Sequence, residues 1–184
     1  MLRVITKATY EDIAANYKGR DIVSAIPAKL VPLWCDEYYF TNPRAELVQV
    51  DVTESATSFN YIFDIKLERT VVAFGIPIFN QHKRDSGRMA GHPLSAGAEF
   101  HRGHLMAHSI GGGTDINLVP QLGKLNIGAF RVLERMVRDL AQENVRSLYF
   151  VRPIYANQTQ TPKSFEQCVI LSSKAIHYSL HNNL

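Results

Sequence analysis

Alternation of apolar and polar residues predicts strands in the first half of the chain. The run Glu46–Val52 (ELVQVDV) alternates residue by residue, which is typical of a strand with one face on a core. Two β-rich runs follow, Tyr61–Leu67 and Thr70–Phe79, and only Glu68-Arg69 separates them. Two such runs joined by a short polar break predict a β-hairpin.

The C-terminal third repeats the strand pattern. The run Val145–Val151 (VRSLYFV) predicts a strand that ends at Pro153, because proline lacks the amide hydrogen that a sheet uses. Ser164–Leu171 (SFEQCVIL) predicts another strand. The tail from there to Leu184 has no clear period and stays unassigned.

A helical period appears once with full regularity, over Leu125–Gln142. Its apolar residues recur at intervals of three and four, with charged residues between them. These apolar residues are Phe130, Leu133, Val137 and Leu140. We therefore expect one long amphipathic helix with one side on the core.

The N-terminal region has weaker helical signals. Thr9 is a suitable N-cap for a short helix over Tyr10–Tyr17. The segment Ser24–Phe40 contains Pro27 and Pro32, so a helix there should be broken or short. Strands, then a helix, then strands indicate an α+β domain with an antiparallel sheet and a short N-terminal helical region. We place the main domain at residues 56–184 and an N-terminal extension, helical in part, at residues 1–55.

Composition narrows the class of protein. A hydrophobic fraction of 46% is that of a globular domain able to bury its own core. With only Cys35 and Cys168, a disulfide framework is excluded and two free thiols are expected. A net charge of +3 is a weak indication of a polyanionic partner. The sequence shows no signal peptide and no membrane-spanning run.

Histidines gather in the middle of the chain, where five of the seven lie between positions 82 and 108. His101, His104 and His108 surround Arg102, just before three consecutive glycines. Three interpretations compete: solvent-exposed loop histidines, a zinc site in which the three share one helical face, and a hydrolytic site. In the hydrolytic site a histidine acts as general base and the arginine binds a phosphate.

The hydrolytic interpretation requires a cation with oxygen ligands, and the predicted helix offers two candidates. Asn126 and Glu134 are eight residues apart, which places them about 80° apart around one helix and roughly 12 Å apart along it. This geometry favours Asn126 as the direct ligand, with Glu134 orienting a metal-bound water. Such a site, with few protein ligands and many waters, suits Mg²⁺.

These residues together resemble the DNA/RNA non-specific endonuclease family, the ββα-metal nucleases with a D-R-G-H motif. The motif reads His101-Arg102-Gly103-His104 here, and the downstream family signature is present at matching intervals. That signature comprises Asn117-Leu118-Val119-Pro120-Gln121, Leu125-Asn126-Ile127-Gly128-Ala129-Phe130 and Leu133-Glu134. The resemblance covers roughly residues 58–175 and extends to segments typical of the variants in bacterial polymorphic toxins.

The resemblance implies a role for each matching residue. His104 would be the general base, Asn126 the direct metal ligand and Glu134 the residue that holds a metal-bound water. Arg102 and Arg88 would contact the scissile phosphate, and Asn117 would organise the site on the substrate side.

His101 departs from the family, which most often has aspartate at this position. The residue could bind phosphate or alter the metal preference. The departure also leaves open a nuclease-like module that binds nucleic acid or protein without catalysis, beside the zinc-domain alternative.

The resemblance also implies a cofactor and partners. The expected cofactor is Mg²⁺, with Mn²⁺ or another divalent cation as alternatives, and the expected substrate is DNA, RNA or both. Cleavage with little sequence specificity would leave 5′-phosphate ends. The toxin-like segments imply an antibacterial toxin domain with a cognate immunity protein. Two locations stay open, the cytoplasm and delivery as a secreted effector, and no membrane association is expected.

Overall fold

The computed structural model describes residues 4–54, 57–80, 99–113 and 115–184. In chain order the helices and strands are α1 (Lys7–Ala15), α2 (Ile22–Ala25), α3 (Pro27–Thr41), β1 (Leu47–Glu54), β2 (Thr57–Asp64), β3 (Arg69–Gly75), β4 (Phe100–His104), the 3₁₀-helices η2 (His108–Ile110) and η3 (Asp115–Asn117), β5 (Leu118–Leu122), α4 (Gly123–Ile127), α5 (Phe130–Gln142), β6 (Ser147–Ile154), β7 (Ser164–Leu171) and β8 (Ile176–Asn182).

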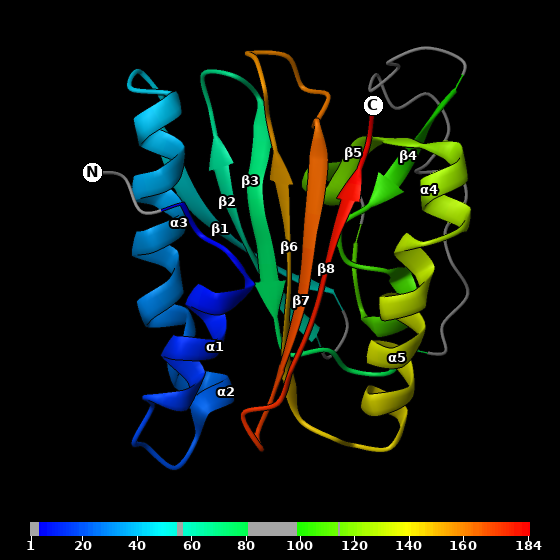
Figure 1. The fold of residues 1–184 in the computed structure, drawn as a ribbon. Coiled ribbons are helices and arrows are strands. Elements are labelled where there is room, and N and C mark those ends of the chain that lie inside the picture. Colours follow the sequence, from blue (N-terminus) through cyan, green and yellow to red (C-terminus); the bar gives the residue numbers. More distant parts are fainter. Residues whose placement is uncertain (1–3, 55–56, 81–98, 114) are drawn as a thin grey trace.

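A six-stranded sheet in the order β1-β2-β3-β6-β7-β8 forms the centre of the fold, and every neighbouring pair is antiparallel. Helices α1–α3 cover one face of the sheet. The two-stranded ribbon β4-β5 lies with α4 and α5 on the other face (Figure 1). The predicted α+β class with an antiparallel sheet is confirmed.

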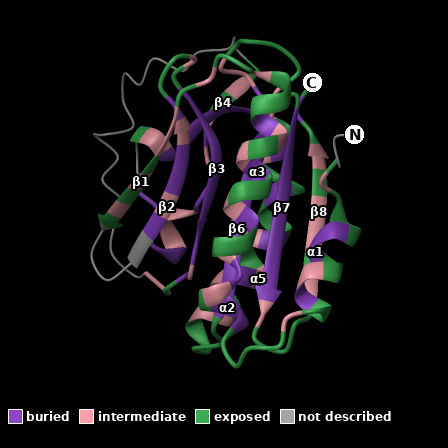
Figure 2. Ribbon diagram, turned by 90° about the vertical axis from the view of Figure 1, so that its left-hand side faces the viewer, coloured by how far each residue is buried: buried purple, intermediate pink, exposed green. Residues whose placement is uncertain are grey.

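Alternation along the inner strands builds a separate core on each face of the sheet. In β6, Leu148 and Phe150 join the core beneath α1–α3, whereas Tyr149 and Val151 join the core beneath α5. Successive side chains of a strand point to opposite faces, so one strand contributes to both cores. Because both faces are covered, β3 and β7 are buried along most of their length (Figure 2).

The strand predictions hold with shifted ends. The hairpin is β2 and β3, but β3 stops at Gly75 rather than Phe79. Strand β6 continues through Pro153, where the sequence predicted its end. Strand β3 pairs only with residues 149–151 of β6, so at Pro153 strand β6 pairs with β7 alone. The other edge of β6 makes no ladder hydrogen bonds there, so proline, which lacks an amide hydrogen, is tolerated.

The expectation of a short or broken helix over residues 24–40 is wrong for α3, which runs for 15 residues. Pro27 occupies its first turn, where an amide hydrogen has no partner in any case. Pro32 lies inside the helix and on its exposed side. Packing compensates for the lost hydrogen bond, because Trp34 and Leu30 on the opposite side are completely buried.

The N-terminal helix also begins earlier than predicted. It starts at Lys7 with Thr6 as the N-cap, and the Thr6 amide donates to the Thr9 hydroxyl at 3.2 Å. Thr9 therefore lies in the first turn of the helix. Threonine suits both positions, and the sequence did not distinguish them.

The single helix predicted over Leu125–Gln142 is two helices, α4 and α5, and they separate at Gly128. A Cβ atom on Gly128 would come within 2.6 Å of the Lys124 carbonyl oxygen, so the chain needs glycine at this break. Asn126 and Glu134 consequently lie on different helices. The angle and separation expected from one continuous helix do not apply to them.

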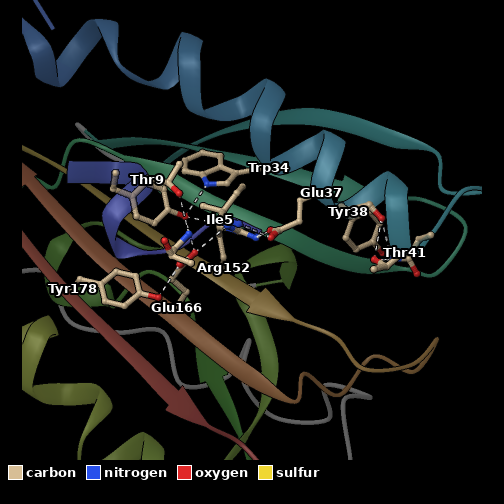
Figure 3. Close-up of polar contacts among 12 residues, drawn as sticks. Ile5, Thr9, Trp34, Glu37, Tyr38, Thr41, Arg152, Glu166 and Tyr178 are labelled. Atoms are coloured by element: carbon tan, nitrogen blue, oxygen red, sulfur yellow. Dashed lines mark hydrogen bonds and ion pairs between the residues drawn. The ribbon is translucent and has the colours of Figure 1, made fainter. Parts of the chain in front are cut away.

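A buried polar network joins the N-terminal helices to the sheet (Figure 3). At its centre Arg152 of β6 forms ion pairs with Glu37 of α3 and Glu166 of β7, and its Nη1 donates to the Tyr10 hydroxyl at 3.0 Å. Tyr10 in turn donates to Glu166 at 2.7 Å, and Tyr178 of β8 donates to the same carboxylate at 2.9 Å. Burial lowers the pKa of Arg152, but its interactions with Tyr10, Glu166 and Glu37 together raise it above the ordinary value.

The expected boundary between residues 55 and 56 falls between β1 and β2, which pair along eight residues. The division into two domains stays a prediction. Cys35 and Cys168 are free, as expected. Among the described residues, no helix has the length and apolar character needed to cross a membrane.

Candidate active site

The histidine-rich tetrad lies on β4, which pairs with β5 in a short antiparallel ribbon. His101 is opposite Gln121 and His104 is opposite Leu118. Because side chains alternate along a strand, positions 101 and 103 belong to one face of the ribbon and positions 102 and 104 to the other. The helical face assumed for a zinc site of His101, His104 and His108 does not exist.

Asn117 fastens the loop that joins β4 to β5. Its Oδ1 accepts from the Met106 amide at 2.7 Å, and its Nδ2 donates to the Met106 and Gly113 carbonyls, each at 2.8 Å. The side chain is completely buried. Asn117 therefore organises the loop next to the tetrad and leaves no exposed atom for direct contact with substrate.

Gln121 is buried on the ribbon, and its side chain is 0% exposed. Among the residues that the structure describes, neither its amide oxygen nor its amide nitrogen has a hydrogen-bond partner. It lies over Gly103, where a Cβ atom would come within 2.2 Å of its Oε1. An unsatisfied buried amide costs about 1–3 kcal/mol, so this position is unfavourable for stability.

A hydrogen bond connects the first residue of the tetrad to α4. The Nδ2 of Asn126 lies 3.3 Å from the Nδ1 of His101. The ring of His101 lies against Gly123, where a Cβ atom would come within 2.6 Å of its Nε2. The Gly123 amide donates to the Glu99 carbonyl at 2.9 Å, which ties the start of α4 to the strand.

Glu134 lies half-buried on α5, the next helix. Burial raises the pKa of its carboxyl from 4.5 to about 7, against the opposing charge of Arg131. Burial is the main cause that raises the pKa of the fully buried Tyr149, and the charge of Glu134 is the next. The two groups therefore interact electrostatically. A carboxyl that titrates near neutrality is typical of a functional position.

The structure thus joins only some of the predicted residues. His101 contacts Asn126, and Glu134 follows on the adjoining helix. Arg102 and His104 are half-buried on β4, and Arg88 lies outside the described residues.

Two residues without a predicted role also belong to this region, Gln121 and Gly123. The pairing of His101 with Gln121 could not be inferred, since it depends on the register of β4 with β5.

The ligand atoms available in this region indicate which cation it could hold. Within the described ranges, no three or more His, Cys, Asp or Glu side chains gather closely enough to hold a metal ion. This excludes a zinc cluster of the three tetrad-region histidines. An amide oxygen from Asn126 with water as the remaining ligands fits Mg²⁺, because Mg²⁺ keeps several waters when bound by proteins.

The model of the DNA/RNA non-specific endonuclease family matches residues 77–171, about half of the chain. The chain belongs to this family. The matched region contains the ribbon, α4, α5 and β6, so the tetrad and both helices lie within it. The family is one of nucleases, and the chain is therefore a nuclease that acts on nucleic acid.

The chain is similar to solved structures of nucleases. A structure named "Structure of Sda1 nuclease with bound zinc ion" is 16% identical with a TM-score of 0.52, covering 78% of this chain and 86% of that one. An "extracellular endonuclease" is 18% identical with a TM-score of 0.47 and coverage of 77% and 80%. At 16% identity the likeness to the first of these structures shows the fold alone. No curated protein matches the chain.

Proposed function

We propose that the protein is a metal-dependent endonuclease that hydrolyses phosphodiester bonds of DNA, RNA or both with little sequence specificity. The observation that carries the proposal is the bond between Asn126 and the tetrad strand, in a chain of the nuclease family. It joins the predicted metal ligand to the strand that bears the predicted base.

His104 would take a proton from the water that attacks the phosphorus atom. Histidine suits this step because its unperturbed pKa is close to neutrality. Arg102 would bind the non-bridging oxygens through its planar guanidinium, and Arg88 would assist. Contacts to the phosphate backbone carry little sequence information, which accounts for the expected lack of specificity.

Asn126 would hold Mg²⁺ through its amide oxygen, and Glu134 would accept hydrogen bonds from water at the site when ionised. A bound divalent cation supplies positive charge that offsets the charge on the transition state and on the leaving 3′ oxygen. Loss of the 3′ oxygen as leaving group yields 5′-phosphate ends.

The direct test is digestion of plasmid DNA and of a structured RNA by purified protein. Protein stripped with EDTA should be inactive, and Mg²⁺ or Mn²⁺ should restore cleavage, with Zn²⁺ as a third arm. Product ends should accept a 5′ label only after phosphatase treatment. Tight binding of nucleic acid without cleavage under any of these cations would instead support a non-catalytic binding module.

The resemblance to toxin variants supports a proposal for the biological role: the protein would be an antibacterial toxin with a cognate immunity protein. Expression in the bacterial cytoplasm should then degrade the host nucleic acid and arrest growth. A His104→Ala protein should be tolerated at the same expression level. Growth that is equally unaffected by both proteins would contradict a toxin role.

A further inference from the structure

We propose that His101 is a positioning residue that holds the side-chain amide of Asn126 with its oxygen turned toward the metal position. This inference rests on the proposed function, in which Asn126 is the metal ligand. It assigns a role to the position at which the chain departs from the D-R-G-H pattern. It also replaces phosphate binding, which the sequence suggested for His101.

The contact with His101 involves the nitrogen end of the Asn126 amide. The Asn126 amide has a donor end, Nδ2, and an acceptor end, Oδ1, and the donor end lies 3.3 Å from His101 Nδ1. A neutral imidazole with its hydrogen on Nε2 accepts at Nδ1. With Nδ2 engaged in this way, Oδ1 is the end of the amide that is turned away from the ring and can take a cation. An amide turned by 180° would place Oδ1 against Nδ1, which in this tautomer only accepts.

The surroundings of the ring hold it in this place. Gly123 provides the space for the imidazole, because any Cβ atom there would approach Nε2 to within 2.6 Å. The bond from the Gly123 amide to the Glu99 carbonyl fixes α4 against the strand that bears His101. Both partners of the hydrogen bond are therefore anchored to the same short stretch of backbone.

The chemistry predicts which side chains could replace His101. In aspartate, Oδ1 is bonded to Cγ as Nδ1 is in histidine, so a carboxylate oxygen can take the same position and can only accept. Phenylalanine keeps a planar ring but has no acceptor. Groups that orient a metal ligand from behind contribute about 10–100-fold to metal affinity.

The experiment measures binding of Mn²⁺ to the chain of 184 residues without nucleic acid, by the electron paramagnetic resonance signal of free Mn²⁺. His101→Phe should weaken binding by about tenfold or more. His101→Asp should bind at least as tightly as the unmodified protein, since the carboxylate keeps an acceptor at this position and adds negative charge. Gly123→Ala should also weaken binding, because it displaces the ring while leaving the imidazole in the chain.

Kinetics provide a second readout. For His101→Phe, the Mn²⁺ concentration that gives half-maximal cleavage should rise, while the KM for DNA at saturating Mn²⁺ stays unchanged. A residue that bound phosphate would instead raise the KM for DNA. Circular dichroism and the melting temperature of each variant in EDTA establish that the fold is retained.

The outcomes separate this inference from the proposed function. If the unmodified protein binds Mn²⁺ and Asn126→Ala does not, the metal role of Asn126 stands. Unchanged Mn²⁺ affinity in His101→Phe would then overturn the positioning role alone, as would an affinity of His101→Asp as low as the one expected for His101→Phe. If the unmodified protein and Asn126→Ala bind Mn²⁺ equally, or neither binds it, both proposals fail.

Discussion

The two faces of the central sheet differ in how completely their buried polar groups are paired. Beneath α1–α3, every charged group of the Arg152 network has a partner of opposite charge. Arg152 is 7% exposed and Glu166 is 1% exposed, and together they connect two strands to α3. This face consists of closed, satisfied contacts, which is what stability favours.

The face that bears the ribbon and α5 tolerates unfavourable arrangements. Gln121 is buried without a hydrogen-bond partner in the described part of the chain, and burial raises the pKa of the Glu134 carboxyl to about 7. The bond between His101 and Asn126 is exposed to solvent. Departures of this kind concentrate where function opposes stability. The contrast is consistent with the proposal that the catalytic residues lie on the ribbon face and that the helical layer supports the fold.

The strongest test of the contrast is His104→Ala on the ribbon face. Loss of a general base should lower kcat for DNA cleavage by about 10²–10⁴-fold. The melting temperature should stay within a degree or two of the unmodified protein. His177→Ala, at an exposed position on β8, is the matched control. Cleavage by His104→Ala at the unmodified rate would remove His104 from the mechanism.

On the opposite face, Arg152→Met should act on stability and leave the chemistry intact. The variant leaves Glu166 buried without its cation, so the free energy of unfolding should fall by about 3–5 kcal/mol. Urea unfolding measures this loss, and cleavage per folded molecule should be unchanged. The double variant Arg152→Met/Glu166→Gln should recover part of the stability. A loss of activity in well-folded Arg152→Met protein would contradict the assignment of catalysis to the ribbon face alone.

Glu134, which lies on the ribbon face, should make the free energy of unfolding depend on pH. Its folded pKa of about 7 lies above the unfolded 4.5, so its contribution is fully present below pH 4.5 and is lost as pH rises through 7. The loss is at most roughly 3 kcal/mol at 1.36 kcal/mol per pKa unit. In EDTA, unfolding of the unmodified protein and of Glu134→Gln should diverge over this range. Parallel curves for the two proteins would show that the carboxyl is not perturbed.

The smallest expected effect is a gain in stability from Gln121→Met. Methionine has similar length and needs no hydrogen bond, so removing the unsatisfied amide should raise the free energy of unfolding by about 1 kcal/mol. Urea unfolding again provides the measurement, with Gln167→Met as the control, because Gln167 is equally buried but hydrogen-bonded to Tyr149 at 2.8 Å. The control should lose stability. A loss in Gln121→Met as large as the control would mean that the amide has a partner in solution.

The alternation of apolar and polar residues predicted most strands, because this pattern is visible in the sequence without knowledge of the tertiary contacts. The run Ser164–Leu171 has the predicted bounds, and Glu46–Val52 is off by a residue or two. Helix ends were less predictable. Pro32 lies within α3 since burial of Trp34 outweighs the lost hydrogen bond, and Gly128 breaks the helix at a contact that the helical period does not show.

The sequence by itself determined the family, because the tetrad and the asparagine and glutamate intervals are local patterns of residue type. It also determined that the fold is an antiparallel α+β domain. Only the tertiary structure decided that His101 meets Asn126, that Asn117 braces a loop and that Glu134 titrates near neutrality. These depend on strand register, on the break between α4 and α5 and on burial, which arise from contacts between segments distant along the chain.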